Sequence, residues 1–168
     1  METIVNKVAE SGILTLNLEH LLPAADTLAT FDIAPYLFKG MILREKDFRT
    51  ALQEMDWAPY AHKKVAVYCS AEAIIPMWAY MLIASWLYKC EAAPFHGNEA
   101  QLKEQLLNQA IDALDVQPYT DGRVVVKGCG DVPLPESAFL RISARLLPVV
   151  KSLMYGEPCS TVPIYKKK

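Results

Sequence analysis

Four residues with metal-binding or nucleophilic side chains stand out in the sequence: Cys69, His96, Cys129 and Cys159. Zinc and iron–sulfur centres are held by thiolates or imidazoles at near-tetrahedral positions, so these four residues are candidate metal ligands. The intervals between the three cysteines are much longer than those of a zinc knuckle or ribbon. The pattern therefore permits zinc or an iron–sulfur cluster without specifying either.

A second chemistry needs one thiol. Cys69, in the stretch VAVYCSAEA, could be a nucleophile or persulfide carrier, activated by the helix N-terminus that follows it and by His96 as a base. A third interpretation is that Cys69 and Cys129 are small residues that fill tight strand ends, because free cysteines are commonly buried and inert. The residues themselves leave all three interpretations open.

Alternating strands and helices position these residues. The pattern predicts parallel strands joined by crossover helices, because a parallel connection needs such a crossover. Cys69, His96 and Cys129 would end three successive strands, whose carboxyl ends form the edge of a sheet where ligands bind. Cys159 follows the last predicted helix and is expected at the opposite edge. The predicted strands are 63–69, 90–97 and 121–129, and the predicted helices are 73–88, 98–114 and 135–156. The first helix is expected to start near Ser70 or Pro76, Asn98 to cap the second, and Pro148 to kink or split the third.

The first 60 residues follow a different order. Residues 13–21 alternate like a half-buried strand, 29–43 hold a further strand or a turn, and 44–55 form an amphipathic helix. No linker or repeat interrupts the sequence. We therefore expect a single α/β domain over 1–168 with a mixed, mostly parallel sheet. Its parts are a β/α N-terminal part (1–60), strand–helix repeats (61–156) and a C-terminal tail (157–168).

Composition excludes some classes of protein. Of the 168 residues 52% are hydrophobic and the formal net charge is −2, which does not favour binding to nucleic acid. The start, METIVNKVAESG, lacks a signal-peptide pattern and predicts a cytoplasmic protein with reduced thiols. Residues 73–88 carry no charge, but they are shorter than the roughly 20 apolar residues of a membrane span.

We therefore expect 73–88 to form a central, almost wholly buried helix and not a membrane segment. The apolar surface of IIPMWAYMLIASW exceeds what one small sheet covers, which predicts a homodimer.

Several segments carry a resemblance to a known family. The chain resembles, nearly end to end, the bacterial family called domain of unknown function 2480. That family has no established activity and no catalytic residues to transfer. Its genes lie near sulfur-mobilisation genes, so the resemblance implies iron–sulfur assembly proteins as partners. The segments are METIVNKVAESGILTLNLEHL, FDIAPYLFKGMILREKDFR, YCSAEAIIPMWAYMLIAS, RVVVKGC and PVVKSLMYGEPCSTVPIYKKK.

The outline of strand, helix and then KKVAVYCSAEAIIPMWAYMLIASWL is also similar to the STAS-like (anti-sigma-factor antagonist) fold. Ser70 would take the place of its switch serine, although the usual Asp-rich strand end and Ser–Gly helix start are missing. The sequence thus predicts a cytoplasmic accessory protein, and not an enzyme, with a Cys-lined site for metal, iron–sulfur or sulfur handling. The alternative is an interaction or regulatory module whose cysteines are structural.

Overall fold

The computed structural model describes residues 12–128 and 130–168. The chain divides into two compact units. Pro23–Lys103 form the central unit, and the described residues on either side of it, 12–22, 104–128 and 130–168, form the terminal unit. Each unit has its own β-sheet and its own hydrophobic core.

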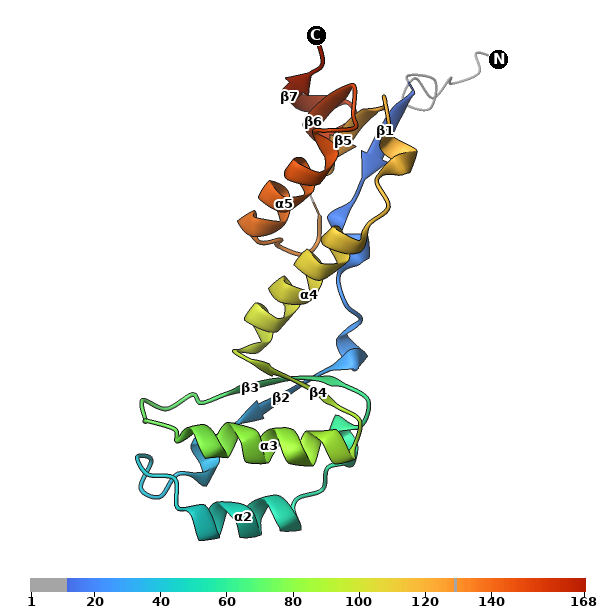
Figure 1. Ribbon diagram of the computed structural model, residues 1–168. Helices are drawn as coiled ribbons and strands as arrows, with labels where there is room; N and C mark the ends of the chain where they lie inside the picture. Colours follow the sequence, from blue (N-terminus) through green and yellow to red (C-terminus); the bar gives the residue numbers. More distant parts are fainter. Residues whose placement is uncertain (1–11, 129) are drawn as a thin grey trace, which may run out of the picture. The chain divides into compact units, whose positions relative to one another are not determined.

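The central unit is a three-stranded parallel sheet in the order β2-β3-β4, covered by two helices. Figure 1 shows α3 and α2 on the same side of this sheet. Buried side chains of both helices, such as Phe48 and Ile83, pack with Val65 and Val67, which lie on one face of β3 because strand residues alternate between faces. The elements are β2 (Leu28–Asp32), α2 (Glu45–Glu54), β3 (Lys64–Tyr68), α3 (Met77–Lys89) and β4 (Ala93–His96).

The terminal unit is a four-stranded sheet in the order β1-β5-β6-β7. The first three strands are parallel, and β7 pairs antiparallel with β6 through a tight hairpin. Ile111 of α4 and Ile142 of α5 pack against Val124 and Val126 in its core. The elements are β1 (Ile13–Leu16), α4 (Glu99–Ala113), β5 (Arg123–Val126), α5 (Glu136–Leu146), β6 (Ser152–Glu157) and β7 (Ser160–Lys166).

Short 3₁₀ helices connect these elements. They are η1 (Leu18–Leu21), η2 (Ala25–Thr27), η3 (Ala34–Tyr36), η4 (Ala58–Tyr60) and η5 (Gln117–Tyr119).

The prediction of an α/β fold with mostly parallel strands is confirmed. The strands are divided between two sheets where the sequence predicts one, because β1 pairs with β5 whereas β2, β3 and β4 pair among themselves. The predicted helix 135–156 ends at Leu146, just before Pro148, and β6 takes its last residues.

The helix α3 corrects one further expectation. One of its faces is buried, but Met77, Met81 and Tyr88 are exposed, so the helix is not almost wholly buried. Among the described residues, no helix is both long enough and apolar enough to span a bilayer.

Candidate functional site

The carboxyl edge of the central sheet is organised by Asp32, the last residue of β2. Its Oδ2 accepts a hydrogen bond from the Ser70 hydroxyl at 2.6 Å, and its Oδ1 accepts the backbone N–H groups of Ser70 and Ala34, each at 2.9 Å. Because β2 and β3 are parallel neighbours and Asp32 is in register with Tyr68, both strands end side by side. Asp32 therefore fixes the start of the loop that carries Cys69 and Ser70.

The charge of Asp32 is stabilised by these three donors. Partial burial of the carboxyl raises its pKa, but the hydrogen bonds from the Ser70 hydroxyl and from the two backbone N–H groups outweigh this effect. The net pKa of Asp32 lies below its ordinary value. The loop after β3 is thus held by an ionised carboxylate at neutral pH.

Cys69 is a free, half-buried thiol in this loop, directly after β3. Its Sγ lies 3.4 Å from the backbone carbonyl oxygen of Ala71. The thiol is also near Tyr80 of α3: burial raises the pKa of the Tyr80 hydroxyl, and the negative charge that Cys69 can carry raises it further. Tyr80 therefore stays protonated at neutral pH and can act as a hydrogen-bond donor.

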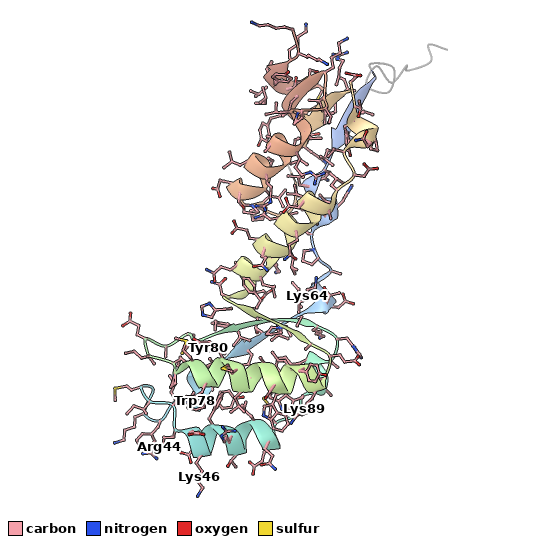
Figure 2. The ribbon with its side chains drawn as sticks, in the orientation of Figure 1. Arg44, Lys46, Lys64, Trp78, Tyr80 and Lys89 are labelled. Atoms are coloured by element: carbon pink, nitrogen blue, oxygen red, sulfur yellow. The ribbon has the colours of Figure 1, made fainter. Side chains whose placement is uncertain are left out.

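His96 ends β4 and contacts the same tyrosine. The rings of Tyr80 and His96 meet edge to face, with their centroids 5.4 Å apart and an interplanar angle of 86°. Figure 2 shows the position of Tyr80 on α3, below the strands of the central sheet. Cys69 and His96 thus lie at the ends of neighbouring strands, and Tyr80 of α3 is in ring contact with His96; we call these three residues the thiol site.

The described candidate ligands belong to two different units. Cys69 and His96 lie at the carboxyl edge of one sheet, as their positions at strand ends predict. The premise that β5 shares this edge is wrong, because β5 belongs to the sheet of the terminal unit. Cys129 lies outside the described residues. Cys159 is an exposed, free thiol in the turn between β6 and β7, and not at the end of a long helix.

The described residues contain no group of three or more His, Cys, Asp or Glu side chains placed to hold a metal ion. A shared site of Cys69, Cys129, Cys159 and His96 remains a prediction, because Cys129 is not among these residues. What the described part provides at the carboxyl edge of the central sheet is a thiol, an imidazole at the end of the neighbouring strand, and a phenol in ring contact with that imidazole.

The terminal unit has a hollow at the carboxyl edge of its own parallel strands. Its volume is about 370 Å³, within the range of small-molecule sites. Glu19 and Lys127 supply charged groups, Tyr155 supplies a phenol, and Leu134 and Phe139 are part of an apolar wall.

Two glycines shape this hollow. A Cβ on Gly128 would lie 2.4 Å from the Tyr155 ring, and one on Gly130 would collide with the Glu19 carboxylate. Tyr155 donates a hydrogen bond from its hydroxyl to the Gly128 carbonyl at 3.3 Å, and Glu19 accepts the Val132 N–H at 3.3 Å. The glycines of KGCGD therefore permit close packing of the loop against β6 and the residues after β1.

Sequence reasoning missed the residues around the thiols. Tyr80 lies in the uncharged stretch 73–88 and gave no signal of its own. Asp32 was visible as an acidic residue at the end of the alternating stretch LATFD. Its partner Ser70 comes from a segment 38 residues away, and only the register of β2 and β3 brings the two together.

Comparison with curated proteins and with solved structures gives no match. The family model described as "Protein of unknown function (DUF2480)" matches residues 2–167 of the 168-residue chain. The chain therefore belongs to the DUF2480 family of proteins of unknown function.

Proposed function

We propose that this chain is a cytoplasmic accessory protein of sulfur, iron–sulfur or metal handling in which Cys69 is the working thiol. The observation that supports this proposal most is the thiol site: Cys69 and His96 end neighbouring strands at the carboxyl edge of a parallel sheet, and the Tyr80 ring contacts that of His96. Ligands bind preferentially at such edges in open α/β sheets.

The chemistry that fits this group is transfer of sulfane sulfur. The Cys69 thiolate attacks the outer sulfur of a persulfide on a donor, and His96 takes up the proton of the thiol. An S–S bond forms at Cys69 while the S–S bond of the donor breaks, and the donor leaves as a thiolate. The transfer needs no added oxidant or reductant.

Tyr80 has a supporting part in this proposal. Its pKa is raised by burial and by the charge of Cys69, so the phenol is neutral at physiological pH. A neutral phenol can donate a hydrogen bond to an anionic thiolate or persulfide, and hydrogen bonds to charged acceptors are the stronger ones. Tyr80 is therefore a positioning residue for the charged sulfur.

Sulfur uptake tests the proposal directly. The reduced, full-length chain is treated with inorganic polysulfide, digested and examined by mass spectrometry for a persulfide on each cysteine. We expect sulfur on Cys69, uptake that is lost in Cys69→Ser, and uptake that is retained in Cys90→Ser and Cys159→Ser. Equal uptake by Cys69→Ser and the unchanged chain would contradict the proposal.

Two further variants separate the roles in the site. His96→Gln should slow uptake at neutral pH more than at high pH, where the thiol loses its proton without help. Tyr80→Phe keeps the ring contact with His96 but removes the hydroxyl, so we expect slower uptake with an unchanged melting temperature. If neither variant changed the rate of sulfur uptake, His96 and Tyr80 would have no part in the reaction of Cys69.

The metal content of the purified chain distinguishes a metal-binding role from a role in sulfur transfer alone. The chain is purified without oxygen, and its zinc and iron are measured by elemental analysis. Stoichiometric metal that is lost on changing Cys69, Cys129, Cys159 or His96 would support a metal or cluster site made of these residues. The family resemblance implies iron–sulfur assembly proteins as partners, so sulfur transfer from a persulfide-bearing assembly protein is the matching functional assay.

The alternative is a non-enzymatic interaction or regulatory module of STAS-like outline, with structural cysteines. The observation that favours it is the exposed hydrogen bond between Ser70 and Asp32, which fixes a serine directly after a strand. A phosphate or carboxylate on Ser70 would meet the Asp32 carboxylate and open this contact. Partner binding that changes in Ser70→Asp and not in Cys69→Ser would favour this alternative.

A further inference from the structure

The solvent-facing side of α3 carries an apolar stripe. Met77 is 76% exposed, Met81 74% and Tyr88 81%, and Ile74, just before the helix, is 93% exposed. Ala84 lies between them on the same face, because these helix positions are three or four residues apart. Exposed apolar side chains that form one continuous stripe mark an interaction surface more often than scattered ones do.

The opposite face of α3 is already in use. Ala79, Ile83 and Leu87 are fully buried in the core of the central unit. The helix is therefore apolar on both sides, although a helix that covers one sheet needs a single apolar face. The stripe of Met77, Met81, Ala84 and Tyr88 has no role in the core of this unit.

The spacing of the stripe residues along α3 is the same in both directions. From Met77 the steps are four residues to Met81, three to Ala84 and four to Tyr88. When two copies of α3 lie antiparallel about a twofold axis, Met77 faces Tyr88 of the second copy and Met81 faces its Ala84. Large side chains then meet small ones at the centre, which is the arrangement that packs well.

The charges at the ends of the stripe favour the same arrangement. Residues 73–88 carry no charge, the exposed Glu72 precedes them and the exposed Lys89 follows, its Nζ 3.8 Å from the centroid of the Trp86 ring. Antiparallel helices bring the amino end of one copy beside the carboxyl end of the other, so the opposite charges attract. A parallel pair would set like charges together. The helix dipoles also favour the antiparallel pair.

We infer that the stripe of α3 is a homodimer interface, in which a second copy of this chain packs its own α3 antiparallel across a twofold axis. Isologous interfaces are self-complementary, and both the spacing and the end charges of the stripe have this property. This inference stands on α3 itself and is independent of the chemistry proposed for Cys69. An interface made by one helix of each copy buries a small surface area for a specific interface, so we expect a dimer of moderate affinity.

Sedimentation equilibrium of the full-length chain tests the inference. We expect a reversible monomer–dimer equilibrium that Met81→Glu shifts to monomer, with a dissociation constant raised by more than about 100-fold, because like charges would face a closed interface. The matched control is Leu140→Glu on α5, where an apolar residue of similar exposure, 75%, is replaced outside the stripe. Leu140→Glu should leave the equilibrium unchanged.

A mixing experiment identifies the partner as a second copy. Met81→Lys and Met81→Glu should each be monomeric, whereas an equimolar mixture should form one-to-one dimers through opposite charges near the axis. Far-ultraviolet circular dichroism should be the same for all variants, because Met81 is exposed. A chain that stays monomeric at high concentration, a dimer that survives Met81→Glu, or a mixture that does not associate would each overturn the inference.

Discussion

Asp32 and Ser70, 38 residues apart in the sequence, form a 2.6 Å hydrogen bond across the ends of two parallel strands. The contact is part of a group of three, because the same carboxylate accepts the backbone N–H groups of Ser70 and Ala34. It ties the loop after β3 to the end of β2. The position of Cys69, which directly precedes Ser70, therefore depends on an acidic residue of another strand.

Replacement of Asp32 should destabilise the central unit. In Asp32→Asn the side chain keeps one acceptor but loses the charge and the second oxygen, so we expect a loss of about 1–3 kcal/mol in the free energy of unfolding. Urea denaturation followed by tryptophan fluorescence measures the change. Asp26→Asn, at an exposed aspartate of the same unit, is the control and should stay within about 0.5 kcal/mol of the unchanged chain. Equal midpoints for both variants would show that the hydrogen bonds of Asp32 contribute nothing.

The contribution of Asp32 should depend on pH in a defined direction. The pKa of Asp32 is lowered in the folded chain, so its carboxyl group stays ionised to a lower pH in the folded state than in the unfolded state. The stabilisation is therefore complete above the unfolded pKa of about 3.9 and disappears as the pH falls through the lower folded value. The stability difference between the unchanged chain and Asp32→Asn should be constant from pH 6 to about 5 and shrink towards pH 3. A difference that grows on acidification would contradict this assignment.

Much of the secondary structure follows from local patterns. Asn98 was expected to cap the helix at 98–114, and in the structure Asn98 and Gln101 exchange hydrogen bonds between side chain and backbone, each at 2.9 Å. Pro76, one of the two expected starts of the helix at 73–88, directly precedes Met77, the first residue of α3. The strands predicted at 63–69, 90–97 and 121–129 are present as β3, β4 and β5, each of which is shorter than predicted.

The hairpin of β6 and β7 was missed for a physical reason. Periodicity extends the predicted helix to residue 156, and Pro148 was expected to kink or split it, whereas in the structure α5 ends at Leu146. The better signal was the turn around Pro158 followed by the β-branched residues of STVPIYK. The division into two sheets could not be predicted, because strand pairing between β1 and β5 joins segments about 110 residues apart.

The candidate site was predictable in part. Strand ends identified Cys69 and His96, because parallel strands end at one edge. Tyr80 and Asp32 were missed, since their roles come from contacts between elements and not from local sequence.

Replacement of Gly128 should disturb the hollow of the terminal unit. A Cβ at this position would lie 2.4 Å from the Tyr155 ring, and a rigid ring cannot yield as a flexible side chain can. We expect Gly128→Ala to cost about 1–3 kcal/mol, the range for overpacking, and to break the hydrogen bond from Tyr155 to the Gly128 carbonyl. Thermal denaturation measures the loss. Gly40→Ala is not a suitable control because Gly40 has a positive φ of 69°.

The matched test is the double variant Gly128→Ala with Tyr155→Ala, which removes the obstacle. If the close contact is the cause, the added methyl group should cost less in the Tyr155→Ala background than in the unchanged chain. Equal costs in both backgrounds would assign the effect of Gly128→Ala to its backbone conformation.

Two arginines of α5 bind the end of α4: Arg141 pairs with the Asp112 carboxylate, and Arg145 binds backbone carbonyls. The Arg145 guanidinium donates to the backbone carbonyls of Asp112 and Leu114, the second at 2.6 Å, and so satisfies acceptors that the end of α4 leaves without partners within the helix. We expect Arg145→Ala to lower the free energy of unfolding by roughly 1–2 kcal/mol, with partial recovery in Arg145→Lys, which keeps the charge but loses the fork of two donors. Chemical denaturation compares both with Arg49→Ala.

Arg49 is the appropriate control because its partner Glu45 lies four residues away on the solvent-exposed face of the same helix. Such surface pairs contribute about 0.3–0.5 kcal/mol, so Arg49→Ala should change the midpoint very little. The two arginines differ in what they bind. Arg145 of α5 binds backbone carbonyls at the end of α4, whereas Arg49 binds the Glu45 side chain on its own helix. If Arg145→Ala proved no more harmful than Arg49→Ala, the carbonyls at the end of α4 would have to be satisfied by water. The link between α4 and α5 would then rest on the ion pair of Arg141 with Asp112 and on the apolar contacts of Ile111 and Ile142.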